Sequence, residues 1–328
     1  MFAALALVFL ACLVVSCALG RYPLSPLTVL KLLVSRIFDI PVTWPPQAET
    51  VLFQVRLPRV LAASLIGAAL AAAGAAYQGL FRNPLVSPDV LGVTAGAGFG
   101  AALAILLSLG SLWTMTASFG FGVLAAVGVG FLAAGFRGDT MLSLVLSGIV
   151  AGSLFTSATS FLKLVADPAN ILPAITYWLM GSLASIRVRD LAYAGPLIVI
   201  SLAVLYSVRW RLNVLTMGED EASTLGTDVP RARIVVIVAA TMATAASVSI
   251  SGMIGWIGLV VPHLARMLVG SDYRVLMPAS MLVGATFLLV VDDIARLAST
   301  AEIPLGILTA FVGAPFFIYL ARKRSRSV

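Results

Sequence analysis

Long apolar runs separated by short polar breaks fill the chain from one end to the other. A helix that rises 1.5 Å per residue needs about 20 apolar residues to cross a hydrocarbon layer of about 30 Å. Ten runs near that length predict membrane-spanning helices at residues 2–19, 60–81, 91–109, 112–135, 141–165, 191–208, 234–251, 254–265, 276–295 and 305–321. The eighth run is too short to span alone and ends at Pro262, as interrupted helices along transport pathways do.

The first run is expected to be a retained helix, and a cleaved signal peptide is the alternative. It has no basic stretch before its apolar part, and no clear cleavage site follows it. The segment 20–59 behind it is rich in proline and too polar for the membrane core. We therefore expect this segment on the outer surface of the membrane.

The second run is unusually rich in small residues. Gly67, Gly74 and Gly79 interrupt an alanine-rich helix, although each glycine costs about 1 kcal/mol of helix propensity relative to alanine. In a membrane, small residues let neighbouring helices approach closely. This face of the helix is therefore expected to pack against other helices.

Composition and charge point to the same class of protein. Of the 328 residues 60% are hydrophobic and 11% are charged, and the mean hydropathy is +1.06. These values predict an all-α polytopic membrane protein that forms a single transmembrane domain over residues 1–328. The net charge of +7 is spread over helix ends, which favours membrane topology over nucleic-acid binding.

The same charges predict an orientation. Slightly more than half of the 21 Lys and Arg residues fall in segments that a ten-helix topology places on the side of both termini, and positive residues favour the cytoplasm. Both termini are thus expected to be cytoplasmic. The basic tail ARKRSRSV is expected to lie near anionic membrane lipid.

Several chemistries are disfavoured by residue inventory. Cys12 and Cys17 lie on different faces of the first predicted helix, so neither a disulfide nor a metal pair is expected there. The sole histidine, His263, is expected to have a structural role, and no resident metal or cofactor is predicted. The sequence has no phosphate-binding loop and no nucleophile elbow, so the chain is expected to be non-catalytic, with ATP and Mg used by a partner.

An ion-coupled secondary carrier is the main alternative, and it would bury ionisable groups near mid-membrane. The interiors of the second to seventh runs contain almost none. Asp292 and Asp293 lie at the predicted outer end of the ninth run beside Arg296, where a local ion pair is favoured. A membrane scaffold or receptor without transport activity is a further alternative.

The longest predicted cytoplasmic connection, residues 209–233, contains a second kind of pattern. Glu219, Asp220 and Glu221 can open a short helix whose N-terminal dipole favours acids, and Gly226 can end it before Pro230. A compact capped helix of this kind is a candidate docking element. A plain surface loop is the alternative interpretation.

Eight motifs, taken together, carry a resemblance over essentially the whole length. They are RLPR at 56–59, the small-residue run and the FRNPLVSPD break at 67–98, YWLMGSL at 177–183, GEDEASTLG at 218–226, GMIGWIGLVVPHLAR at 252–266, DYRVLMPAS at 272–280, DDIAR at 292–296 and EIPLGILTAFVGAPFFIYL at 302–320. The chain resembles the FecCD-type permeases of type II ABC importers, which carry metal chelates across the bacterial inner membrane. The resemblance implies a homodimer with two cytoplasmic ABC ATPase subunits and a periplasmic substrate-binding protein.

The resemblance also implies roles for individual residues at the two membrane surfaces. The arginines expected to be exposed outside and to dock the binding protein are Arg56, Arg59 and Arg296. The residues expected to couple the chain to the ATPase are Gly218, Glu221, Ala222, Leu225 and Gly226.

Along the pathway itself, two further sets are expected. The cytoplasmic gate is predicted at Asn83, Leu85, Thr140 and Met141, with Pro84 ending the second helix and Met141 departing from the small polar residue expected there. The fifth helix is expected to line the pathway through Ser147, Gly148, Gly152, Ser153 and Thr156. A ferric siderophore is the first expectation for the cargo, and haem, cobalamin and molybdate are the alternatives.

Overall fold

All regular elements of the described residues are helices, and the apolar runs account for the long ones. The computed structural model describes residues 1–20, 22–38, 41–136, 140–299 and 301–325. The helices are α1 (Phe2–Ala18), α2 (Pro26–Val34), α3 (Pro46–Thr50), the π-helical η1 (Val51–Arg56), α4 (Leu57–Leu80), the 3-10 turn η2 (Pro88–Leu91), α5 (Val93–Leu106), α6 (Ser111–Ala134), α7 (Thr140–Val165), α8 (Ile171–Leu179), α9 (Val188–Ser207), α10 (Arg209–Met217), α11 (Glu219–Thr224), α12 (Val229–Ser251), α13 (Ile257–Val269), α14 (Tyr273–Leu297) and α15 (Leu305–Ser325).

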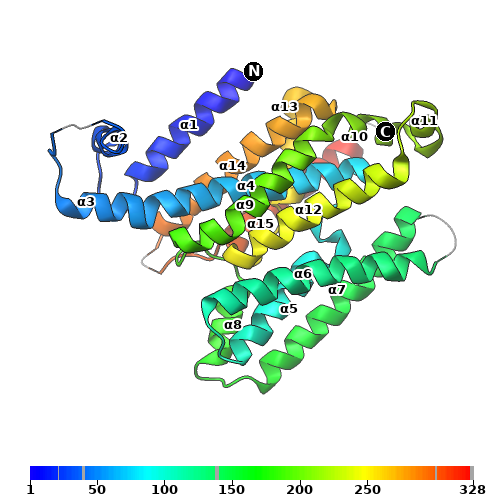
Figure 1. Ribbon diagram of the computed structural model, residues 1–328, viewed down its shortest axis with the longest axis horizontal. Helices are drawn as coiled ribbons and strands as arrows, with labels where there is room; N and C mark the ends of the chain where they lie inside the picture. Colours follow the sequence, from blue (N-terminus) through cyan, green and yellow to red (C-terminus); the bar gives the residue numbers. More distant parts are fainter. Residues whose placement is uncertain (21, 39–40, 137–139, 300, 326–328) are drawn as a thin grey trace.

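Each of the ten predicted spans overlaps one of these helices. Six helical runs are long and apolar enough to cross a membrane by length and composition, and α1, α5, α13 and most of α15 are shorter apolar helices. The long helices run roughly side by side, with α3 at one end of the molecule and α11 at the other (Figure 1). We call these the α3 end and the α11 end. The predicted all-α polytopic membrane fold is confirmed.

The second predicted span begins earlier than expected. Helix runs without a break from Pro46 through α3 and η1 into α4, so the predicted start at residue 60 is wrong. Pro46 opens the helix because a proline in the first turn loses no intrahelical hydrogen bond. The π-helical turn that follows, in which the Leu57 N–H donates to the Leu52 carbonyl, accommodates Pro58 and its missing donor.

Close backbone contacts make α4 the central helix, as its glycines predicted. A Cβ at Gly67 would lie 2.2 Å from the carbonyl oxygen of Gly284 in α14. A Cβ at Gly74 would lie 1.9 Å from the carbonyl oxygen of Gly258 in α13. Nearly every residue of α4 is buried, and Tyr77 also hydrogen-bonds Thr241 of α12 at 3.1 Å.

The eighth span corrects two expectations. It begins at Ile257 rather than 254, because residues 252–256 are non-helical and Trp256 has φ +69°. Pro262 lies inside α13, which continues to Val269. The helix tolerates the proline because Gln78 of α4 supplies the missing donor: its Nε2 lies 3.4 Å from the Gly258 carbonyl oxygen and 3.3 Å from that of Leu259. His263, the residue after Pro262, makes an edge-to-face ring contact with Phe316 of α15.

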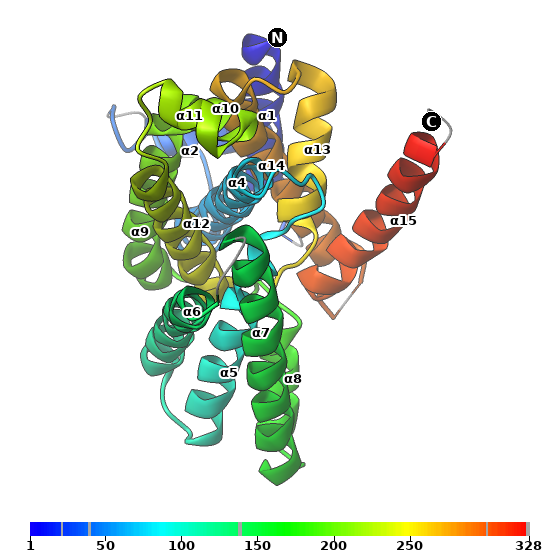
Figure 2. The ribbon, with the colours of Figure 1, turned by 90° about the vertical axis from the view of Figure 1, so that its right-hand side faces the viewer.

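The remaining helices form groups around α4. Figure 2, in which the α11 end faces the viewer, shows α5, α6, α7 and α8 together below α4 and α15 standing apart on another side. Helix α12 contacts both α4 and α6, so it joins the lower group to the centre. The Gly-rich α5 packs along α6 and α7.

We expect Gly74→Ala to lower the free energy of unfolding by about 1–3 kcal/mol, since the added methyl group meets a backbone carbonyl that cannot rotate away. The change is measured by thermal unfolding in detergent, with size-exclusion chromatography used to monitor the folded fraction. Gly128→Ala in α6 is the matched control, because nothing lies within 4 Å of its added Cβ. Equal melting temperatures for the two variants would contradict the close contact between α4 and α13.

Candidate functional site

A cavity lined by hydroxyl groups lies between α7 and η2. Its volume is about 500 Å³. Four of the five predicted pathway residues line it together with Asp89: Gly148, Gly152, Ser153 and Thr156. They share a face of α7 because their spacing follows the helical period. The fifth, Ser147, is almost completely buried and does not line this cavity.

A second cavity adjoins the first and extends it toward α8. Asp89, Gly152 and Thr156 line both cavities. The second adds Thr94 of α5, Lys163 of α7 and Met253 from the segment between α12 and α13. The Thr94 hydroxyl donates a hydrogen bond to the Asp89 carboxylate. The combined space is therefore lined by small residues, hydroxyls, one carboxylate and one ammonium group.

Sequence reasoning missed Asp89, Thr94 and Lys163. A signal was present for Asp89, which is the only acidic residue between Glu49 and Asp139. An isolated carboxylate in so apolar a stretch is expected to have a specific environment. Thr94 and Lys163 carry no comparable sequence signal, since their place on the cavity depends on how α5 and α7 pack.

The segment that leads from α4 to η2 lies directly against α7. A Cβ at Gly148 would lie 1.9 Å from the Val90 carbonyl oxygen. Gly92, with φ +68°, lies opposite Gly152. The predicted gate residues Asn83 and Leu85 are exposed at the start of this segment, where the Asn83 side chain accepts a hydrogen bond from the Leu85 N–H at 2.9 Å.

One detail of the predicted gate is wrong. Pro84 does not end the helix, because α4 already ends at Leu80, Arg82 adopts φ +51°, and the Asn83 N–H donates to the Gln78 carbonyl. Thr140 lines a different cavity, between α6, α7 and α12, together with Arg233. Met141 packs, partly buried, against the core. The role of these residues as a gate stays a prediction.

The loop 209–233 folds into two short helices, α10 and α11, as its acids and glycines predicted. The three acids occupy the first turn of α11, and Gly226 follows it with φ +76°. The Asp228 side chain caps α12. Met217 and Leu225, on either side of α11, are largely exposed. We call α10 and α11 together the knob.

The knob is fixed to the body of the protein at its base. Ala222 is fully buried, so this predicted coupling residue anchors α11 rather than facing outward. Glu219 pairs with Arg233 at the start of α12. Gly218 has φ +135°, a conformation that favours glycine, and the Glu221 carboxylate folds over it.

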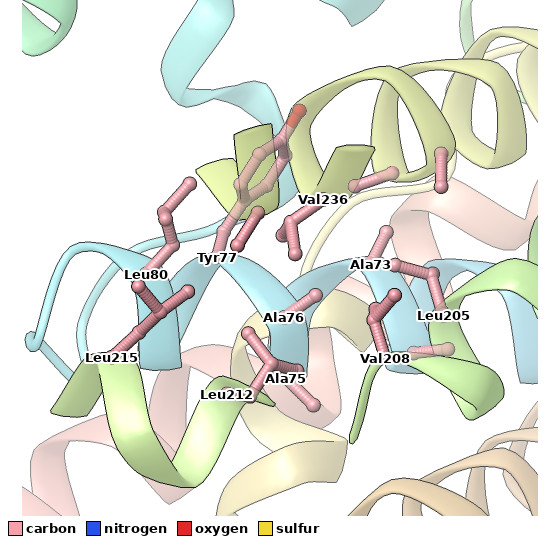
Figure 3. Packing of buried hydrophobic residues seen from close by; sticks show 14 of the residues in the cluster. Ala73, Ala75, Ala76, Tyr77, Leu80, Leu205, Val208, Leu212, Leu215 and Val236 are labelled. Carbon is pink, nitrogen blue, oxygen red and sulfur yellow. The ribbon is translucent and has the colours of Figure 1, made fainter. Parts of the chain in front are cut away.

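Helix α10 ties the knob to α4 and α14. Figure 3 shows Leu212 pointing toward Ala75, and Leu215 toward Leu80, at the α11 end of α4. The Asn213 amide donates to the Asp272 carboxylate at 2.6 Å, and this hydrogen bond lowers the pKa of Asp272 from its ordinary value. These contacts hold the knob against the α11 end of α4.

At the α3 end, the three predicted docking arginines are buried, so their expected exposure is wrong. Their exposed fractions are 4% for Arg56, 7% for Arg59 and 8% for Arg296. Arg56 donates to the carbonyls of Cys17 and Ala18 at 2.8 Å each, and Arg296 donates to that of Ser16 at 2.7 Å. These carbonyls belong to the last turn of α1, where they lack intrahelical donors.

The third arginine joins α4 to α14 and to the segment before α15. Arg59 forms ion pairs with Asp292 at 2.9 Å and with Glu302 at 2.8 Å. Asp293 pairs with Arg296 and accepts a hydrogen bond from Ser16. The local ion pair predicted for Asp293 is confirmed, whereas Asp292 reaches across to α4.

Comparison with known proteins places this geometry in context. The model of the FecCD transport family matches residues 7–323. The molybdate import system permease protein MolB of Haemophilus influenzae is 44% identical over 95% of this chain and 92% of its own length. The cobalamin import system permease protein BtuC of Halobacterium salinarum is 43% identical over 85% of this chain and 75% of its own length.

A solved structure is similar along almost its full length. It is an inward-facing ABC transporter assigned to the metal-chelate type, with a TM-score of 0.86 and 39% sequence identity, and the match covers 98% of each chain.

Two glycines of α7 provide a matched test of the contact between α7 and the segment 83–92. We expect Gly148→Ala to displace the Val90 backbone and to cost about 1–3 kcal/mol of folding free energy. Gly152→Ala should be tolerated, since its Cβ has 3.9 Å to the nearest atom. Thiol labelling of Leu85→Cys in each background measures the displacement. Identical labelling rates would argue against the contact.

Removing the Arg59 side chain should be strongly destabilising. Arg59→Gln leaves the fully buried Asp292 without its partner, which costs about 3–5 kcal/mol in comparable sites, and the double variant with Asp292→Asn should recover part of the loss. Unfolding curves in detergent measure both. Arg189→Gln is the control, since that side chain is exposed and its nearest carboxylate lies 4.0 Å away. A single variant as stable as the control would count against a structural role for Arg59.

Proposed function

Because this chain belongs to the FecCD transport family, we propose that it is the membrane-spanning permease subunit of an ATP-driven importer of metal-containing compounds. It resides in the bacterial inner membrane as a multi-pass protein, and ATP hydrolysis takes place on separate ATPase subunits. The observation that carries the proposal is the knob, a capped pair of short helices that projects from the α11 end and is joined rigidly to α4. A projecting element with a fixed base can convert movement of a partner into movement of helices.

This role gives the molecule its orientation. The ATPase partners are cytoplasmic, so the α11 end faces the cytoplasm and the α3 end faces the periplasm. In Figure 1, α1 begins and α15 ends away from the α3 end, which agrees with cytoplasmic termini. The exposed Met217 and Leu225 supply apolar contacts for the ATPase, and the acids of α11 supply charge.

A second copy of the chain completes the pathway. The cavities along α7 and η2 are open to the outside of a single chain, so cargo moving along them would escape sideways. A partner copy placed against this face closes them into a channel between the two subunits. The segment 83–92 then controls the cytoplasmic mouth through its contact with Gly148 and Gly152.

The periplasmic binding protein docks at the α3 end. Arg56, Arg59 and Arg296 serve this surface chiefly by holding it in shape, since direct pairing with a partner would require each buried guanidinium to leave its internal acceptors. Acidic lobes of a binding protein would instead meet residues exposed at the same end. Affinity for the binding protein is thus expected to fall in Arg59→Gln only as far as folding stability falls.

A ferric siderophore is the first cargo proposed, because relatives include permeases named for iron chelatin, iron(3+)-hydroxamate and hemin transport. Molybdate is a second candidate, favoured by the 44% identity to a molybdate permease over 95% of the chain. The lining fits either, since hydroxyls and Lys163 can contact anionic oxygens. The negative charge of Asp89 repels multiply charged anions, which favours larger chelates as the cargo.

We expect Leu225→Asp to weaken binding of the ATPase subunit by about tenfold or more, because it places a charge in an apolar contact at the tip of the knob. Co-purification and binding isotherms with the purified ATPase measure the change. Arg231→Gln, an exposed change nearby on α12, should leave binding intact. If Leu225→Asp binds the ATPase with unaltered affinity, the knob is not part of the contact with the ATPase.

Transport itself tests the function directly. Proteoliposomes that contain this chain and its ATPase, with binding protein outside, should accumulate labelled cargo only when ATP is inside. Ferric siderophore and molybdate are supplied in parallel, and the one that accumulates identifies the class. Uptake that persists without ATP or without the ATPase would overturn the proposal in favour of a coupled carrier.

A further inference from the structure

We propose that α2 is an interfacial helix that lies in the surface of the lipid bilayer at the α3 end, with one apolar stripe dissolved in phospholipid. Residues 19–25 connect the helix to α1, and Arg56 donates to carbonyls of both parts, those of Cys17 and Ala18 in α1 and that of Tyr22 in the connection. Its position is therefore fixed relative to the end of a membrane helix. This inference concerns the membrane surface and is independent of the cargo and of ATP hydrolysis.

The side chains of α2 divide into three faces at the helical period of 3.6 residues. Val29 and Leu32 form the first face and are fully buried in a cluster with Cys17 of α1 and Leu52 of η1. The second face is an exposed apolar stripe with exposed fractions of 63% for Leu27, 46% for Leu30 and 41% for Val34.

The third face is polar and lies beside the stripe. It contains Lys31, Thr28 and Ser35. A helix in contact only with water would place polar residues over its whole outer surface, whereas here polar residues take one edge and apolar residues the other. This division matches a helix at a boundary between lipid and water.

The stripe continues beyond the helix. Ile37 and Phe38, which follow α2, are 79% and 63% exposed. Arg36 between them and the helix stacks its guanidinium over the Phe53 ring of η1 at 4.4 Å, which holds the end of α2 against η1. Together the exposed residues form an apolar patch too large for scattered surface positions, and such patches mark a partner or a membrane.

Three observations select lipid as the occupant of the patch. Helix α2 packs beside α1, whose Val15 is exposed, as is Leu19 directly after it. The axis of α2 lies across the direction of the long helices, since Figure 1 views it end-on while α4 and α12 run in the plane. Lys31 sits at the edge where an ammonium group can reach anionic headgroups.

A second copy of the chain does not fit as the occupant. The open cavities that a second copy would close lie along α7 and η2. Viewed from the α11 end, α2 lies on the other side of α4 from α7 and α8 (Figure 2). The patch therefore remains at the outside of such a dimer, where the surrounding molecules are lipids.

The experiment uses nitroxide labels on the full transporter, with its ATPase, in nanodiscs of phosphatidylethanolamine and phosphatidylglycerol. Cys12→Ala and Cys17→Ala provide a background without native thiols, accepted once it melts like the parent protein. Leu30→Cys and Leu27→Cys place labels on the stripe, and Lys31→Cys is the matched control on the polar edge. Collision rates with oxygen, which dissolves in lipid, and with a nickel chelate, which stays in water, are compared.

Labels at residues 27 and 30 should collide at least several-fold more with oxygen than with the nickel chelate, and the label at residue 31 should show the reverse bias. Three results would overturn the proposal. Preferential nickel collisions at residue 30 would place the stripe in water. Dipolar broadening between two labels at residue 30 would place a second copy there. Immobilisation only after addition of the binding protein would assign the patch to that protein.

Discussion

The backbone contact of α4 with α13 and α14 is the constraint on which the rest of the structure depends. Lipid tails are as apolar as leucine, so burial of apolar surface adds little to association between helices in a membrane. Association between these helices depends instead on van der Waals contact, which requires helix surfaces that carry no bulky side chains. Gly67 against Gly284, and Gly74 against Gly258, bring backbone to backbone. With α4 enclosed, its two ends become fixed points from which other elements extend.

Several long polar side chains inside the helix bundle pair with groups on other helices, because lipid offers no hydrogen bonds. Gln78 supplies the donor that Pro262 removes from α13, and Arg266 in turn donates to Gln78 at 3.1 Å. Arg56 and Arg296 satisfy the last carbonyls of α1 in the same way. These side chains are long enough to cross between helices, so each pairing also fixes a distance between two elements.

Sequence reasoning predicts the spans, the close packing of α4 and the capped helix α11, because each depends on local pattern. Run length determines a span, glycine spacing determines a contact face, and acids before a glycine determine a short helix. Sequence reasoning fails where the conformation of a segment depends on a side chain from another helix. Pro262 predicts a helix end, yet Gln78 from 180 residues away keeps the helix continuous.

The arginines show the same limitation at the candidate site. Arg56 and Arg59 lie between polar and apolar segments, a pattern that is typical of exposed anchors. Their acceptors on α1, α14 and the segment before α15 are distant in sequence, so the local sequence pattern cannot reveal these pairings. Ser147 and Gly148 are adjacent in sequence, but Gly148 meets the Val90 carbonyl of η2 and lines the cavity while Ser147 does not, because the rotation of α7 decides which residue faces η2. Asp89 could have been singled out by its isolation, whereas Lys163 could not.

Under the proposed function, the attachments of the knob let a single helix, α4, serve both the ATPase contact and the cavity. Leu212 and Leu215 seat α10 against the last turns of α4, and the segment 83–92 leaves α4 directly after those turns. That segment meets α7 with carbonyl-to-glycine contact at Gly148, where no flexible side chain can absorb a shift. Under the proposed function, a displacement of α10 passes through the leucine side chains to α4 and then through the backbone contact at Gly148 to the cavity wall. The second attachment, from Glu219 to Arg233, leads through α12 to the cavity that Thr140 lines. Both routes start at the knob and end on α7, so under the proposed function a push at α11 is expected to move α7.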